Sequence, residues 1–143
     1  QKRYACSKEA CLCQSVVEGM GPMGGLLSLF ESTGADEILI AACDMPFISG
    51  GVLELLARAP AESMATVCVS EGMAEPLLAR YSSRIVPELV SRIKDSKLSM
   101  RRMIEELDVL YIEEEQWRVV DPGGLSFLNI NTPEDYKLVF EEE

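Results

Sequence analysis

Histidine is absent from the 143-residue chain. Its absence excludes a histidine general acid or base, serine–histidine and cysteine–histidine nucleophile pairs, and zinc sites with imidazole ligands. A zinc site at Cys6, Cys11 and Cys13 is also disfavoured, because their spacing differs from the two-residue spacing of a zinc knuckle. With five cysteines, an odd number, and no secretory features, we expect reduced thiols.

Long apolar runs and basic side chains are also scarce. No apolar run approaches the ~20 residues that span a bilayer. The chain starts with Gln1-Lys2-Arg3-Tyr4, without an initiator Met or a hydrophobic signal region. Thirteen Lys and Arg stand against 24 Asp and Glu, for a formal net charge of −11. Such a field repels phosphate backbones and anionic lipids, so we expect neither a nucleic acid nor a membrane partner. We predict a soluble, cytoplasmic protein whose first residue lies inside a longer polypeptide.

Apolar residues make up 48% of the chain, enough for one globular domain. We predict an irregular remnant over residues 1–15 and a single domain over 16–143. Apolar spacing predicts helices that begin near Pro22 and Ser49, over 85–93 and 98–107, and after Thr132. Strands are predicted over 38–42, 66–69, 76–81, 109–112 and 127–130. This alternation favours an α/β fold with a mainly parallel sheet.

Asp44 is the sharpest candidate for chemistry. It directly follows the predicted strand 38–42, and open α/β sheets bind ligands at the carboxyl ends of their strands. A carboxylate there is a hard oxygen ligand that suits Mg²⁺ bridging substrate phosphates. The alternative is a turn-forming Asp before Pro46.

Three further segments carry polar or flexible residues that suit a ligand site. The glycine-rich segment 19–25 would let the backbone and the amides of the next helix approach an anion, or it is only a tight turn. Asn129 and Asn131 share one face of the predicted strand and could contact a polar ligand, or they only lead into a helix cap. The Arg101-Arg102 pair could face an anionic substrate, or it is a solvated helix face.

Taken together, these segments resemble the molybdenum cofactor guanylyltransferase family. The resemblance covers residues 16–140 and rests on four motifs in order, Gly21-Pro22-Met23-Gly24-Gly25-Leu26, Cys43-Asp44-Met45-Pro46-Phe47, Glu75-Pro76-Leu77-Leu78-Ala79-Arg80-Tyr81 and Asn129-Ile130-Asn131-Thr132-Pro133-Glu134-Asp135. The cytidylyl relatives would show Asp where Asn129 stands, which favours the guanylyl branch.

The resemblance implies a Rossmann-like nucleotidyltransferase fold and the transfer of GMP from GTP to molybdopterin, with pyrophosphate released. Asp44 would be the catalytic Mg²⁺ ligand and would lie beside the nucleotide, together with Gly21, Gly24 and Glu18. Glu18 is the only acid near the position where the family has an Asp. By the same resemblance, Asn129 and Asn131 would contact the bound substrates. We predict that Arg101 also contacts a substrate.

The family's first strand and its Leu-Ala-Gly-Gly-x-Ser-x-Arg-Met-Gly loop, which precedes a Lys, have no counterpart in these 143 residues. The fold is thus expected to be N-terminally truncated, with an unpaired edge beside strand 38–42. That edge would pair with another chain, as a homo-oligomer, or be covered by ~60 further residues. Two other functions remain open: a non-catalytic relative that binds a nucleotide or a partner, and a sugar-phosphate nucleotidyltransferase of the same fold.

Overall fold

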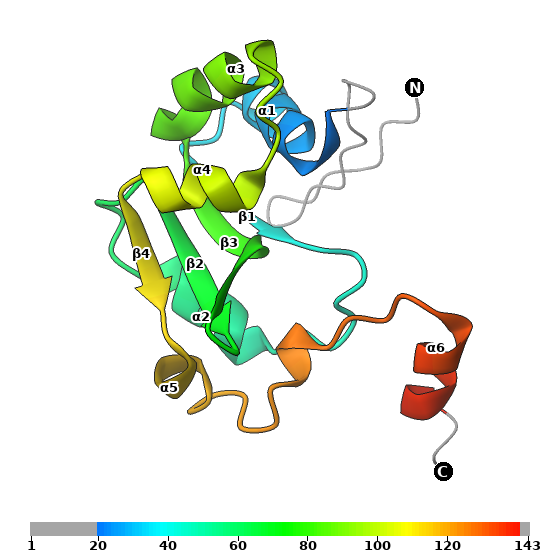
Figure 1. The fold of residues 1–143 in the computed structure, drawn as a ribbon. Coiled ribbons are helices and arrows are strands. Elements are labelled where there is room, and N and C mark those ends of the chain that lie inside the picture. Colours follow the sequence, from blue (N-terminus) through cyan, green and yellow to red (C-terminus); the bar gives the residue numbers. More distant parts are fainter. Residues whose placement is uncertain (1–19, 141–143) are drawn as a thin grey trace.

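The computed structural model describes residues 20–140, with side chains through residue 137. The predicted irregular segment 1–15, its three cysteines and Glu18 lie outside the described residues. Figure 1 shows a twisted sheet with helices on both faces, and helix α6 standing away from the sheet. In chain order, the elements are α1 (Gly21–Thr33), β1 (Glu37–Ala41), α2 (Gly50–Arg58), β2 (Ala65–Ser70), β3 (Met73–Ser82), the short 3₁₀ helix η1 (Ser83–Ile85), α3 (Val86–Lys94), α4 (Met100–Glu106), β4 (Val109–Ile112), α5 (Glu114–Trp117), the 3₁₀ helix η2 (Leu125–Phe127) and α6 (Pro133–Phe140).

The helices begin and end where their capping residues predict. Pro22 occupies the first turn of α1, and Gly34 ends that helix in the left-handed conformation, at φ +63°. The side chain of Ser49 accepts a hydrogen bond from the amide of Gly51 and so caps α2. Thr132 caps the start of α6 through the amide of Asp135. Local sequence therefore fixes the ends of these three helices.

The four strands form one sheet in the order β1-β3-β2-β4. Strand β3 runs antiparallel to both of its neighbours, and β2 runs parallel to β4. Strands β1, β2 and β4 consequently point in the same direction, with β3 reversed between β1 and β2. The predicted α/β fold is confirmed, but the sheet is mixed, because β3 returns through a hairpin instead of a helical crossover.

A two-residue turn makes this hairpin. Glu71 and Gly72 both have positive φ, at +53° and +74°, and they join the paired residues Ser70 and Met73. Two consecutive left-handed residues give the turn a twist that matches the twist of the flanking strands. Further along, the register between β2 and β3 shifts after Val67, which opposes Ala79, while the next residue opposes Glu75. β3 therefore bulges across residues 76–78.

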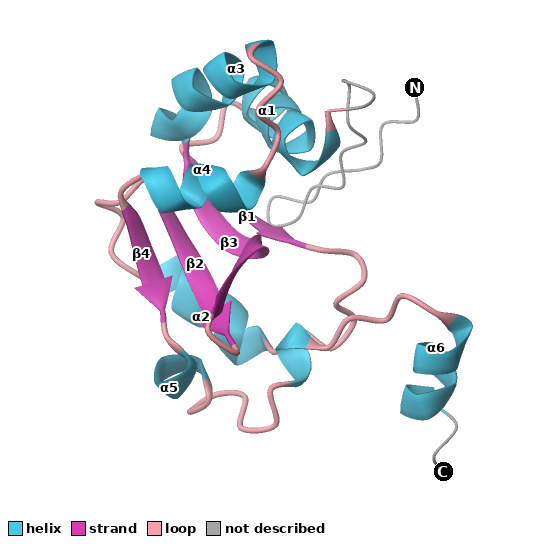
Figure 2. Cartoon of the chain, viewed as in Figure 1, coloured by secondary structure: helices cyan, strands magenta, loops and turns pink. Residues whose placement is uncertain are grey.

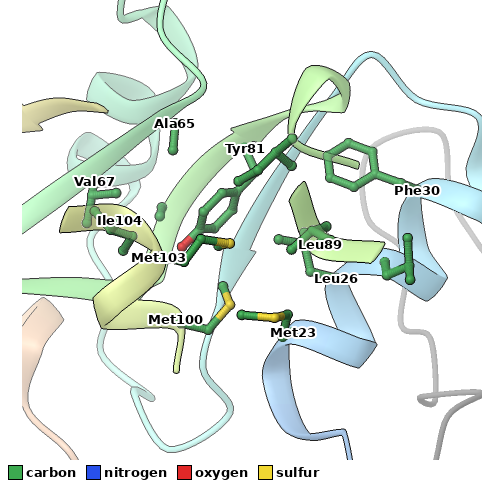
Figure 3. Close-up of a cluster of buried hydrophobic side chains, with 13 residues drawn as sticks. Met23, Leu26, Phe30, Ala65, Val67, Tyr81, Leu89, Met100, Met103 and Ile104 are labelled. Atoms are coloured by element: carbon green, nitrogen blue, oxygen red, sulfur yellow. The ribbon is translucent and has the colours of Figure 1, made fainter. Parts of the chain in front are cut away.

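Alternation along the strands divides the core into two halves. On one face, Val67 of β2 and Tyr81 of β3 pack under α1, α3 and α4, and Figure 3 shows this cluster. On the other face, Leu78 of β3 and Ile112 of β4 pack against α2 and Trp117. The sheet is therefore the middle of three layers.

Two further sequence expectations differ from the structure. The strand predicted over 127–130 is absent: η2 ends at Phe127, and the chain continues irregularly to Thr132. Hydrogen bonds from its amides to the preceding turn, at Gly124 O and Leu125 O, and to Asp44 O replace a strand ladder. A strand of the predicted mainly parallel sheet would be buried on both faces, but residues 38–40 of β1 are only half-buried. Within the described residues β1 pairs with β3 alone, and so it is an edge strand.

Candidate functional site

Asp44 lies in the loop that follows β1. It comes three residues after Ala41, the last residue of that strand, and its side chain is half-buried. Within residues 20–140 its carboxylate has no hydrogen-bond or ion-pair partner. The loop backbone is held by two bonds, since the amide of Ala42 donates to Leu77 O at 2.9 Å and the amide of Met45 donates to Ala42 O at 3.2 Å. The structure thus presents an uncommitted carboxylate on an ordered turn at the carboxyl end of a strand.

The segment that carries Asn129 and Asn131 meets this loop from the far end of the chain. The amide of Ile130 donates a hydrogen bond to Asp44 O at 2.9 Å, and Figure 2 shows the two loops meeting. Asn129 and Asn131 flank this contact, and both are exposed. The amide of Asn131 belongs to the α6 cap, because it donates to the Asp135 carboxylate at 3.1 Å. The two asparagines therefore stand next to Asp44 in the structure, while their ligand roles remain predictions.

The glycines predicted to bind a nucleotide lie in the first turn of α1. Gly21 has φ +57° and is exposed, whereas Gly24 is buried. Among the described residues, no side chain caps the start of this helix. Met23 of α1 and Met100, the first residue of α4, lie side by side in the core, as Figure 3 shows. The beginnings of α1 and α4 are therefore neighbours.

Arg101 is the second residue of α4, and its side chain is exposed. It consequently lies near the start of α1. Among the described residues, Arg101 makes no contact with the Asp44 loop. Glu18, the other acid predicted to lie beside the nucleotide, is outside the described residues.

Sequence reasoning missed a set of buried polar residues behind the Asp44 loop. Asp121 and Ser126 are 7% and 0% exposed. The amide of Ser126 donates to the Asp121 carboxylate at 2.9 Å, and the amide of Ser49 donates to Ser126 Oγ at 2.9 Å. The signal available in the sequence was the Asp121-Pro122-Gly123-Gly124 run, a turn pattern that gives no indication of the partner Ser49.

Neither described cysteine has features of a nucleophile pair. Cys68 is buried in the sheet, and burial, helped by the charge of Glu75, raises the pKa of its thiol to about 12. Cys43 is exposed beside Asp44. No group of three His, Cys, Asp or Glu side chains that could enclose a metal ion occurs among residues 20–137.

Two pockets lie away from Asp44. One, of about 460 Å³, is lined by α2, β4 and α5, and includes Leu55 and Val120. The other, of about 620 Å³, lies between α3 and α4 and includes Arg92 and Arg102. Arg92 is already paired there with Glu88 and Glu106. In the described part of the chain, no helix is long and apolar enough to cross a membrane.

An α/β sheet with a carboxylate and two amides gathered beyond the carboxyl end of a strand has the form of a small-molecule-binding α/β domain. Residues 3–110 match the model of the MobA-like NTP transferase domain family. The chain belongs to this family.

Curated relatives agree with that assignment. The chain is 31% identical over 126 residues to a probable molybdenum cofactor guanylyltransferase of Bacillus subtilis, covering 87% of this chain and 62% of the relative. It is 31% identical over 130 residues to a protein of the same name from Methanosarcina mazei, covering 90% of this chain and 58% of the relative. The chain thus spans about 60% of the length of these relatives.

Solved structures share the fold. A molybdopterin-guanine dinucleotide biosynthesis protein A from Archaeoglobus fulgidus superimposes with a TM-score of 0.79 at 32% identity, covering 93% of this chain and 68% of that one. A putative protein from Aquifex aeolicus superimposes with a TM-score of 0.70 at 18% identity, covering 87% of this chain and 63% of that one. The chain therefore has a nucleotidyltransferase-type α/β fold.

Proposed function

We propose that this chain is the part of a molybdenum cofactor guanylyltransferase that carries Asp44, and that the enzyme transfers GMP from GTP to molybdopterin. Family membership and the names of the relatives support the reaction class. The observation that carries the proposal is the contact between the Asp44 loop and the Asn129–Asn131 segment. It brings two motifs that are far apart in sequence to one edge of the sheet.

Asp44 fits a Mg²⁺ ion that is shared with substrate phosphates. Its carboxylate is half-exposed and has no protein partner within the described residues, so no ion pair has to break before it binds a cation. Mg²⁺ usually keeps several waters and takes only one or two carboxylates plus substrate phosphates, which agrees with the lack of a three-ligand cluster among residues 20–137. When bound, the ion would neutralise charge that develops on the triphosphate.

The reaction needs positioning more than it needs a nucleophilic side chain. An oxygen of molybdopterin attacks the α-phosphorus of GTP, the bond from that phosphorus to the β-phosphate oxygen breaks, and pyrophosphate leaves. Asp44 would fix the triphosphate through the cation, and the exposed amides of Asn129 and Asn131 would orient polar substrate groups. The absence of histidine is compatible with this chemistry.

Replacing Asp44 with Asn tests the proposal. Because the change removes the metal-binding charge and keeps the shape, we expect the turnover of the natural full-length polypeptide to fall by ~100-fold or more. The measurement is pyrophosphate release with GTP, Mg²⁺ and molybdopterin. The control is Asp95→Asn, an exposed acid just past the end of α3, which should retain activity. Unchanged turnover in Asp44→Asn would refute the metal role, and activity with a sugar phosphate instead of molybdopterin would favour the sugar nucleotidyltransferase alternative.

A further inference from the structure

The loop that carries Asp44 is tied at two points to one later segment of the chain. Near the middle of the loop, Asp44 O accepts a hydrogen bond from the amide of Ile130 at 2.9 Å. At its end, the amide of Ser49 donates to Ser126 Oγ at 2.9 Å. Both partners lie within residues 126–130: Ser126 belongs to η2, and Ile130 lies between Asn129 and Asn131. These two bonds connect the backbone of Asp44 and the start of α2 to the segment that carries the two asparagines.

Hydrogen bonds to the Asp121 carboxylate hold Ser126 in place. Burial by itself raises the pKa of the Asp121 carboxyl. Hydrogen bonds from the hydroxyl and amide of Ser126, and from the amides of Leu125 and Gly124, outweigh that effect and hold the pKa below its usual range. A buried carboxylate with this many donors is well fixed in one position. Asp121 thus fixes the position of the Ser126 hydroxyl, which accepts the hydrogen bond from the Ser49 amide.

A third contact joins the backbone at the start of α2 to the side chain of Val120. A Cβ atom on Gly51 would lie 2.6 Å from Val120 Cβ, so only glycine allows the start of α2 to pack against Val120. The hydroxyl of Ser49 lies 3.5 Å from Val120 O, at the limit of a hydrogen bond, while its oxygen accepts the amide of Gly51. The start of α2 and residues 120–126 therefore form one packed unit.

We propose that Asp121 and Ser126 are positioning residues that set where Asp44 stands relative to Asn129 and Asn131. The proposal rests on the function proposed above, because it gives these two buried groups a part in substrate alignment. They touch no reacting atom in this scheme. They act through the Ser49 amide and through the chain that leads from Ser126 to Ile130.

Amide hydrogen exchange in the 143-residue chain tests the coupling without any ligand. In Ser126→Ala, the amide of Ser49 loses its acceptor and Asp121 loses a donor. We expect the amides of Ile130 and Ser49 to exchange roughly tenfold faster than in the unsubstituted chain. The amide of Val67, in the central strand β2, should keep its rate. Should Ser126→Ala fail to fold, Asp121→Asn preserves side-chain size and should accelerate the same two amides.

Thr66→Val is the matched control. Thr66 is also buried, and its hydroxyl oxygen also accepts one hydrogen bond, from Arg80 at 3.3 Å, but it has no link to residues 120–130. This variant should leave the exchange rate of the Ile130 amide as it is in the unsubstituted chain. If the amides of Ile130 and Val67 exchange faster by the same factor in Ser126→Ala, Ser126 contributes only to the stability of the whole domain, and the proposal is overturned. Unchanged exchange at Ile130 would overturn it as well.

The consequence for catalysis is a separate measurement in the natural full-length polypeptide. If the positioning role holds, Ser126→Ala should lower kcat by roughly tenfold while the KM for GTP changes little, because misplacement affects alignment more than binding. A wild-type protein without transferase activity would refute the proposed function, and the exchange result would still decide the coupling. An active protein whose kcat is unaffected by Ser126→Ala would overturn the positioning role.

Discussion

A single buried arginine shows how much one side chain can hold together. Arg80 is 6% exposed and donates to the carbonyl oxygens of Leu56, Ala57 and Pro60 at 2.8–2.9 Å. Two of these carbonyls belong to the last turn of α2, where a cation also favours the negative end of the helix dipole. Arg80 therefore closes the end of α2 opposite to the one capped by Ser49.

We expect Arg80→Met to lower the free energy of unfolding by about 3 kcal/mol, because it leaves buried carbonyls without donors. Urea unfolding followed by circular dichroism measures the change. Arg58→Met is the control: Arg58 pairs with Glu54 at 2.7 Å, but both side chains are largely exposed, so the loss should stay under about 0.5 kcal/mol. Equal losses in the two variants would contradict the capping role of Arg80.

The lowered pKa of the Asp121 carboxyl predicts that the stability of the protein depends on pH. Its native pKa lies below the usual value of about 4, so the unfolded chain takes up this proton first as the pH falls. Its stabilising contribution is therefore complete above the ordinary pKa and is lost as the pH falls through the native pKa. We expect the difference in unfolding free energy between wild type and Asp121→Asn to be constant from about pH 7 to 5 and to shrink below about pH 4. A difference that does not change with pH would show that the ionised form of Asp121 is not favoured in the native state.

At the scale of elements, the β2–β3 hairpin decides the topology of the sheet. Its turn requires a left-handed residue at Gly72, where an added Cβ would meet no atom within 4 Å. Any cost of a side chain there is consequently conformational and not steric.

Gly72→Ala should therefore cost about 1 kcal/mol of unfolding free energy. Gly25 offers a matched comparison, because an added Cβ also meets nothing there, but it lies inside α1 with helical backbone angles. Gly25→Ala should stabilise the chain by roughly 0.5–1 kcal/mol, since alanine is a better helix former than glycine. Chemical denaturation of both variants measures the two effects. A destabilised Gly25→Ala, or a neutral Gly72→Ala, would be inconsistent with these backbone conformations.

At the scale of the whole molecule, the Asp44 edge offers few phosphate contacts. Near Asp44, the described residues provide one carboxylate without a partner among them and two exposed asparagines, within a chain of net charge −11. The resemblance of the sequence to the family leads us to expect that the family's glycine-rich loop, whose backbone amides would hold a triphosphate, has no counterpart in these 143 residues.

We therefore expect the 143-residue chain to bind GTP weakly even with Mg²⁺ present. Isothermal titration calorimetry of the chain with GTP and Mg²⁺ measures this directly. A second titration without Mg²⁺ serves as the control, and it should show still weaker binding. Micromolar affinity would contradict the expectation and would place the main nucleotide contacts within residues 1–143.

The sequence by itself determined the local features of this protein. Apolar spacing and capping residues such as Pro22, Ser49 and Thr132 located five of the helices but not α5, because helix ends depend on hydrogen bonds within a few residues. The four motifs, through their residues and their order along the chain, were sufficient to indicate the family, which the family match confirms.

Tertiary structure alone decided what depends on distant partners. The strand predicted at 127–130 is absent because its amides bond elsewhere: those of Phe127 and Leu128 donate to Gly124 O and Leu125 O of the preceding turn, and that of Ile130 donates to Asp44 O. The place of β3 between β1 and β2 follows from packing and pairing across the sheet, which no local pattern encodes. The contact of Ile130 with Asp44 and that of Ser126 with Ser49 join residues 77 or more positions apart, and so only the folded chain reveals them.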